Sequence, residues 1–117
     1  MLQTFGLLEQ EGMAARDLSY GQQKLLTVAC CVALEASLLL LDEPVAGVNP
    51  SMTQQMLELL LRLSREDGKT ILLIEHNMDA VMTISDRVIA LDEGRIIADG
   101  KPEEVKANAA LVDAYLT

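Results

Sequence analysis

Two adjacent carboxylates directly follow an apolar run, and this pair is the strongest chemical signal in the sequence. Residues 38–44 read Leu-Leu-Leu-Leu-Asp-Glu-Pro. The leucines predict a buried strand, which would place Asp42 and Glu43 at the carboxyl end of a parallel sheet, where α/β proteins hold ligands. Alternatively, the two acids merely start a surface turn and Pro44 stops the strand. The first interpretation predicts a site for a metal-bound nucleotide.

A second candidate site surrounds Ser19. Ser19 and Gln22 have the Ser-x-x-Gln spacing of a capping box at the start of a helix predicted over about residues 20–35. The free N–H groups and the dipole of a helix N-terminus favour anions, and Gly21 would let a phosphate approach the backbone closely. The alternative is a helix cap that binds no ligand.

The single histidine, His76, follows a second apolar run at residues 70–75. A helix predicted from residue 50 to about 67, which begins with Asn49-Pro50, separates the two runs. This strand–helix–strand order predicts a parallel pair and returns His76 to the sheet edge that carries the carboxylates. A structural histidine that only satisfies hydrogen bonds is the alternative.

The remaining elements complete an α/β pattern. Residues 1–17 predict a short helical lead-in, and Asp92-Glu93-Gly94 is typical of a hairpin turn. After residue 77 the sequence predicts a helix at 78–84, strands at 87–91 and 95–98, and a terminal helical region that opens at Pro102.

Composition narrows the possible classes of protein. The 117 residues are 50% hydrophobic, which suffices for one core. A net charge of −9 with only nine Lys and Arg argues against a nucleic-acid partner. Cys30 and Cys31 are adjacent, which suits small buried side chains in a reducing cytosol rather than a disulfide or zinc site. No apolar run reaches the length of about 18 residues needed for a membrane span, so we expect a cytoplasmic chain without its own span.

Four motifs in order resemble those of ABC-transporter ATPases. Leu-Ser-Tyr-Gly-Gln at 18–22 is similar to the signature motif, and the leucines with Asp42-Glu43-Pro44 are similar to Walker B. Residues 46–50 are similar to the D-loop and 74–76 to the switch-histidine segment, called the H-loop. The resemblance covers about residues 7–117.

The resemblance implies ATP and Mg²⁺ as cofactors and a role for each matched residue. Asp42 would hold Mg²⁺ through water, Glu43 would act as general base on the attacking water, and His76 would contact the γ-phosphate. Gly47 and Asn49 would belong to the D-loop. The signature residues would bind the γ-phosphate of an ATP held mainly by a second ATPase subunit in a head-to-tail dimer: Ser19, Tyr20, Gly21 and Gln22.

The family's Walker A motif, Q-loop and aromatic adenine-stacking segment are missing from the sequence. No glycine begins the Gly-x-x-x-x-Gly-Lys-Ser/Thr pattern of Walker A, and Gly68-Lys69-Thr70 lies between a predicted helix and a strand, the reverse of the required order. The chain therefore resembles the C-terminal portion of a P-loop NTPase-type three-layer sandwich, with a signature-helix segment at 1–35 and the other motifs at 36–117. We expect the isolated chain to be inactive and to bind Mg-ATP weakly or not at all.

Within the family, the sequence is most similar to ATP-binding subunits of branched-chain amino acid importers, with urea importers as close relatives. Residues 103–105 and 114–116 add to that similarity. The implied partners are transmembrane permease subunits at the inner face of the cell membrane. Two other classes stay open: a non-catalytic protein that docks on an intact ATPase, and the head domain of a DNA-repair or chromosome-structure ATPase. Acidic charge and the lack of flanking heptads disfavour the last.

Overall fold

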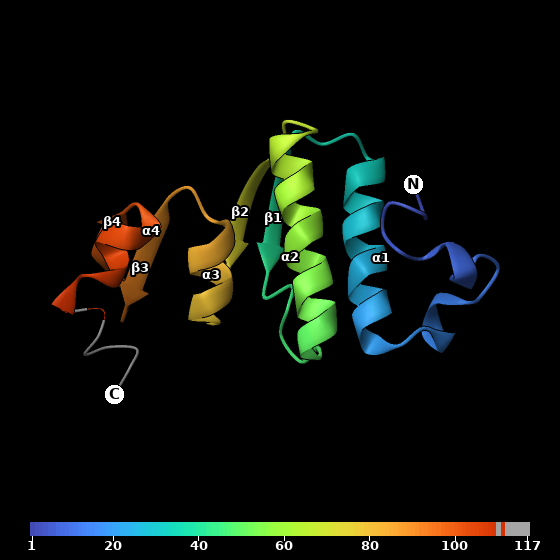
Figure 1. Ribbon diagram of the computed structural model, residues 1–117, viewed down its shortest axis with the longest axis horizontal. Helices are drawn as coiled ribbons and strands as arrows, with labels where there is room; N and C mark the ends of the chain where they lie inside the picture. Colours follow the sequence, from blue (N-terminus) through green and yellow to red (C-terminus); the bar gives the residue numbers. More distant parts are fainter. Residues whose placement is uncertain (110, 112–117) are drawn as a thin grey trace. The chain divides into compact units, whose positions relative to one another are not determined.

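The computed structural model describes residues 1–109 and residue 111 (Figure 1). The chain folds as two compact units, Met1–Glu75 and a second unit that begins at His76. The first unit contains a parallel strand pair and the second an antiparallel hairpin, so the predicted α/β class with these two sheet types is confirmed. Residues 114–116, which add to the predicted similarity to branched-chain amino acid importers, lie outside the described part of the chain.

The first unit contains two helices and two strands after an irregular lead-in. Residues before Ser19 form turns and two short 3-10 helices, so the predicted helical lead-in is not a continuous helix. Within the described residues, no helix is both long enough and apolar enough to cross a bilayer. In chain order the elements are η1 (Leu8–Gln10), η2 (Ala15–Asp17), α1 (Tyr20–Ala33), β1 (Leu38–Asp42), α2 (Pro50–Arg65) and β2 (Thr70–Ile74).

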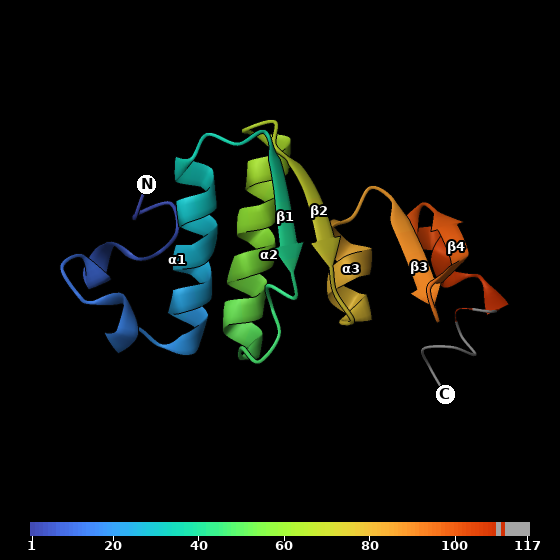
Figure 2. The same cartoon turned by 180° about the vertical axis from the view of Figure 1, so that it is seen from behind.

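Helix α2 forms the centre of this unit. It lies between α1 and the strand pair in both views of the ribbon (Figures 1 and 2). Its apolar residues recur at the spacing that places them on one face of a helix, which explains why that face is buried. The four side chains at this spacing are each at most 4% exposed: Met56, Leu59, Leu60 and Leu63.

The two strands are apolar on both faces but are covered on only one. Leu39 is 2% exposed, whereas its neighbour Leu40 is 67% exposed, because successive side chains of a strand point to opposite faces. The prediction of two fully buried strands is therefore wrong for one face of the pair. We call this the open apolar face; its residues are 50–67% exposed and comprise Leu38, Leu40, Leu72 and Ile74.

The cysteines of α1 also depart from the prediction. Cys30 is exposed and Cys31 is partly exposed, so neither is the fully buried side chain that the sequence predicted. The helix turns a different face inward, which carries Leu25, Val28 and Ala29. At 100° per residue, the two cysteines that follow Ala29 rotate away from that face.

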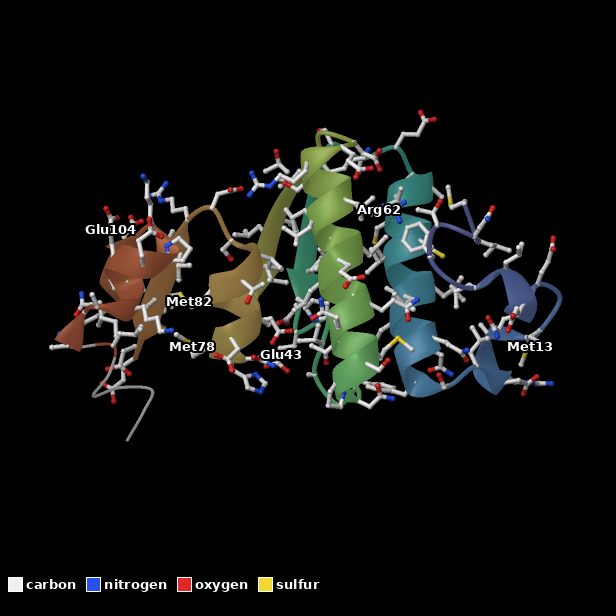
Figure 3. The ribbon with its side chains drawn as sticks, viewed as in Figure 1. Met13, Glu43, Arg62, Met78, Met82 and Glu104 are labelled. Carbon is white, nitrogen blue, oxygen red and sulfur yellow. The ribbon has the colours of Figure 1, made fainter. Side chains whose placement is uncertain are left out.

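The second unit packs two helices against the hairpin. Strand β3 pairs with β4 around a turn in which both Glu93 and Gly94 have positive φ, as a type I′ hairpin turn requires. Met78 and Met82 of α3 pack against the buried cluster of this unit (Figure 3). The elements are α3 (Met78–Ile84), β3 (Val88–Asp92), β4 (Arg95–Gly100) and α4 (Pro102–Lys106), and the cluster comprises Val88, Ala90, Ala98, Val105 and Leu111.

An ion pair links the residue before β3 to the last part of β4, at the open end of the hairpin. Arg87 donates two hydrogen bonds to Asp99, from Nε to Oδ1 at 2.8 Å and from Nη2 to Oδ2 at 2.7 Å. These hydrogen bonds and the positive charge of Arg87 lower the pKa of the Asp99 carboxyl, and the same pair raises the pKa of Arg87. Both side chains are exposed, so solvent screens the pair and its contribution to stability is small.

We expect Asp99→Asn to lower the melting temperature slightly at neutral pH. Because the folded-state pKa of Asp99 is lowered, the stabilisation is present above its unfolded-state pKa of about 4 and is lost as the pH falls through the folded-state value. Thermal unfolding of both proteins between neutral and strongly acidic pH should therefore show a difference that vanishes in acid. A difference that is constant across the pH range would contradict this prediction.

Helix α2 begins with the cap that the sequence predicted. The Asn49 side chain accepts a hydrogen bond from the Met52 backbone N–H at 2.9 Å, and Pro50 occupies the first turn, where no N–H donor is needed. The start of α2 is therefore fixed by two neighbouring side chains.

Removing this cap should destabilise the first unit. Asn49→Ala leaves the Met52 N–H without its partner and should cost about 1 kcal/mol of unfolding free energy. Asn49→Asp keeps an acceptor at the same place and serves as the matched control, with a cost of only a few tenths of that amount. Urea denaturation followed by circular dichroism measures both variants; equal midpoints for Asn49→Ala and the unaltered chain would refute the role of the cap.

Candidate functional site

The predicted carboxylate pair lies at the carboxyl end of β1. Asp42 is the last residue of the strand and pairs in register with Ile74 of β2. Glu43 follows directly, and its backbone N–H donates to the Ile74 carbonyl at 2.8 Å. Both acidic residues are exposed, and Figure 3 shows Glu43 at the exit of the strand pair. The structure therefore places both carboxylates at the edge that the sequence predicted.

Backbone geometry makes Glu43 unusual. Its φ of 47° lies in the left-handed region, which side chains other than Gly, Asn and Asp seldom adopt. Pro44 and Val45, which follow it, are buried. The chain thus turns sharply at Glu43 and returns into the protein, while the Glu43 carboxylate stays accessible.

Two residues that the sequence did not single out hold this turn. Glu75, just after β2, accepts a hydrogen bond from the Val45 backbone N–H through Oε1 at 3.0 Å. Lys24 of α1 donates from Nζ to the Glu43 carbonyl at 2.7 Å. A carboxylate at the end of a predicted strand was a signal that could have drawn attention to Glu75, whereas no local pattern marks Lys24.

Glu75 also leaves one oxygen unused. Its Oε2 atom is buried and has no hydrogen-bond partner among the described residues. Buried carboxylate oxygens nearly always have a partner, because leaving one unsatisfied costs free energy. At this edge of the first unit, Glu75 Oε2 can therefore accept a further hydrogen bond.

At the start of α1, the predicted capping box is confirmed. Ser19 Oγ accepts from the Gln22 N–H at 3.3 Å, and Gln22 Oε1 accepts from the Ser19 N–H at 3.0 Å. Gly21 has a packing role, since a Cβ there would lie 2.7 Å from Cγ of Met52. Tyr20 is 57% exposed. The predicted contacts of these residues with a γ-phosphate remain predictions.

The predicted D-loop lies between β1 and α2. Gly47 has a φ of 72°, which favours glycine, and a Cβ at this position would lie 3.2 Å from Cε1 of Tyr20. Asn49 caps α2, so its side-chain oxygen is already engaged in the helix start. The loop is thus tightly fitted to the first turn of α1.

His76 is the first residue of the second unit and is exposed. It follows β2 by two residues, as the sequence predicted. The proposal that it shares a site with Asp42 and Glu43 stays a prediction.

The chemistry available at the end of β1 is that of two accessible carboxylates. Among the described residues there is no group of three or more His, Cys, Asp or Glu side chains that could enclose a metal ion. Mg²⁺ does not need such a cage, because it commonly keeps several waters and uses one or two carboxylates together with substrate phosphates. The donor set of Asp42 and Glu43 fits a Mg²⁺ bound in that way.

Three comparisons identify relatives of this chain. Residues 5–78 match the family model described as AAA domain, putative AbiEii toxin, Type IV TA system. The chain is 44% identical over 115 residues to the high-affinity branched-chain amino acid transport ATP-binding protein LivG of Salmonella typhimurium. It is 41% identical over 115 residues to the corresponding protein BraF of Pseudomonas aeruginosa. Each match covers 98% of this chain and 45% of the relative, so the chain spans about half the length of these relatives.

Solved structures agree with these matches. The ADP conformation of an ATP-binding cassette of an ABC transporter superposes with a TM-score of 0.87 at 29% identity, covering 98% of this chain and 46% of that one. Part of the cbiONQ ABC transporter complex from Clostridium perfringens superposes with a TM-score of 0.83 at 33% identity, covering 96% and 45%. The chain therefore belongs to the AAA-domain family, and it matches ATP-binding cassettes of ABC transporters.

Proposed function

We propose that this chain is the C-terminal portion of the ATP-hydrolysing subunit of an ABC importer, with branched-chain amino acids as the transported class. The observation that carries the proposal is the match to branched-chain amino acid transport ATP-binding proteins over 98% of the chain at 44% identity. That match spans nearly the whole chain, whereas the broader family model covers residues 5–78, a range that also contains the carboxylate pair.

In this proposal Asp42, Glu43 and His76 divide the work of hydrolysis. Asp42 holds Mg²⁺ through water, and the ion, when bound, neutralises charge on the phosphates. Glu43 accepts a proton from the attacking water, which suits an exposed carboxylate at a strand end. His76 donates a hydrogen bond to the γ-phosphate.

The signature residues act in trans in this proposal. Ser19, Tyr20, Gly21 and Gln22 of one subunit bind the γ-phosphate of an ATP held mainly by a second ATPase subunit, in a head-to-tail dimer, with Gly47 and Asn49 of the D-loop beside it. The dipole and the N–H groups of a helix N-terminus favour anions, which supports an anion-binding role at the start of α1. Permease subunits are the further partners, and the assembly lies at the inner face of the cell membrane.

Two structural features support the proposal that a further polypeptide segment completes this domain. Parallel sheets are normally covered on both faces, yet the open apolar face is exposed and forms a shallow hollow of about 170 Å³ beside Asp42. The buried Oε2 of Glu75 has no partner among the described residues. A segment carrying Walker A, which this sequence lacks, would cover the face and supply the phosphate-binding loop.

A second candidate is a non-catalytic protein that docks on an intact ATPase. The open apolar face also favours this role, since a surface of this kind marks an interaction site. Under this alternative the chain would change the activity of a complete partner but would gain no activity from an upstream half.

Complementation distinguishes the two candidates. We expect the chain alone to show no ATP hydrolysis and no micromolar binding of Mg-ATP in calorimetry, because without Walker A its contacts with one nucleotide would be limited to Asp42, Glu43 and His76. Co-expression with the upstream half of a branched-chain relative should produce phosphate release. Micromolar affinity for the isolated chain, or no hydrolysis after a stable complex has formed, would contradict the proposal.

The role of Glu43 is tested in the complemented protein. Glu43→Gln should lower kcat by at least about 100-fold, since a general base contributes about 10²–10⁴-fold to the rate, while ATP binding is retained. Glu9→Gln, which alters an exposed carboxylate of the same size on η1, is the control and should leave kcat unchanged. Equal loss of activity in both variants would contradict the assignment of Glu43 as the general base.

A further inference from the structure

Glu43 needs support from its surroundings to keep its conformation. Its φ of 47° is one that few side chains other than Gly adopt without constraint, and such conformations persist where neighbouring groups fix them. Two backbone hydrogen bonds contribute: the Glu43 N–H donates to the Ile74 carbonyl at 2.8 Å, and the Ala46 N–H donates to the Glu43 carbonyl at 3.2 Å. The first hydrogen bond involves the adjacent strand β2, and the second lies within the loop.

A third hydrogen bond to the Glu43 backbone, shorter than these two, comes from another element. Lys24 Nζ reaches from α1 across 19 residues of sequence and donates to the Glu43 carbonyl at 2.7 Å. Hydrogen bonds from a charged donor are roughly twice as strong as neutral ones. The Glu43 N–H is bonded to Ile74, so the contact from Lys24 to the Glu43 carbonyl constrains the second peptide plane and hence the φ and ψ angles between the two planes.

Lys24 is itself held in place by an aromatic ring. Its ammonium lies 5.2 Å from the ring centroid of Tyr20, one turn earlier on α1, within the range of a cation–π contact. The same ring lies against Gly47, where a Cβ would be 3.2 Å from Cε1. The first turns of α1 thus contact the loop at two points, the Glu43 carbonyl and Gly47.

We propose that Lys24 is a positioning residue for Glu43, which it holds in the left-handed conformation through the Glu43 carbonyl. The conformational part depends only on the contacts described above, and the catalytic part rests on the proposed role of Glu43 as general base. Lys24 does not enter the reaction, so its loss should lower kcat and leave the KM for ATP unchanged.

The chain offers a matched control for this proposal. Lys69 also donates from Nζ to a backbone carbonyl, that of Ala36, at 2.6 Å. This bond lies before β1, at the opposite end of the strand pair from Glu43. Lys69→Met therefore removes a bond of the same chemistry without touching the loop.

The conformational test uses the full chain without nucleotide. A positive φ brings the amide proton and Hα of one residue close together, so Glu43 should show a strong intraresidue NOE in NMR spectra. We expect Lys24→Met to weaken it, Lys24→Arg to restore it through another cationic donor, and Lys69→Met to leave it unchanged. An undiminished NOE in Lys24→Met, or failure of Lys24→Arg to restore it, would overturn the proposal. Should Lys24→Met fail to fold, Lys24→Gln, whose shorter side chain cannot reach, replaces it under the same criteria.

The catalytic test uses the complemented protein with Glu43→Gln measured in parallel. A displacement of about 1 Å at a reacting group can cost about 100-fold in rate, so we expect Lys24→Met to lower kcat by about 10- to 100-fold at constant KM. Lys24→Arg should recover most of the rate. If Glu43→Gln is inactive and Lys24→Met is fully active, the positioning role is wrong and the proposed function stands. If Glu43→Gln is fully active, the proposed role of Glu43 as general base fails, and the NMR result alone decides the conformational claim.

Discussion

The parallel pairing of β1 with β2 is the interaction on which the candidate site depends. It sets Asp42 opposite Ile74 and lets the Glu43 N–H continue the ladder to the Ile74 carbonyl. The same register brings Glu75 within hydrogen-bond distance of Val45. A slip of one residue would exchange the faces of the strand and move the carboxylates away from the position where the loop can close. Strand register thus determines the geometry of the chemical groups.

The strand pair also explains why the first unit has an incomplete core. Helix α2 covers one face through its apolar stripe, and the open apolar face has no cover among the described residues. A two-stranded sheet is marginal by itself, and parallel strands are normally enclosed. This arrangement fits the proposal that another polypeptide segment completes the domain, in keeping with relatives about twice as long as this chain.

Helix α1 contacts the loop between β1 and α2 (residues 43–49), which we call the carboxylate loop, and also forms its own cap. Lys24 and Tyr20 contact the loop at Glu43 and Gly47, while Ser19 closes the capping box at the same end of the helix. The helix start and the carboxylate loop are therefore one packed structure. In the proposed head-to-tail dimer, the helix start that binds one nucleotide would also support the general base that acts on another.

The sequence by itself determined the features that depend on neighbouring residues: the caps at Ser19 and Asn49, the apolar stripe of α2 and the carboxylates at the end of β1. Hydrogen bonds over three residues and regular apolar spacing are local, so patterns predict them. Only the tertiary structure decided which face of the strands stays open and which side chains hold Glu43. Lys24 and Glu75 reach their partners across 19 and 30 residues, and a local pattern cannot identify the partner at such separations, because the pairing depends on how the elements pack.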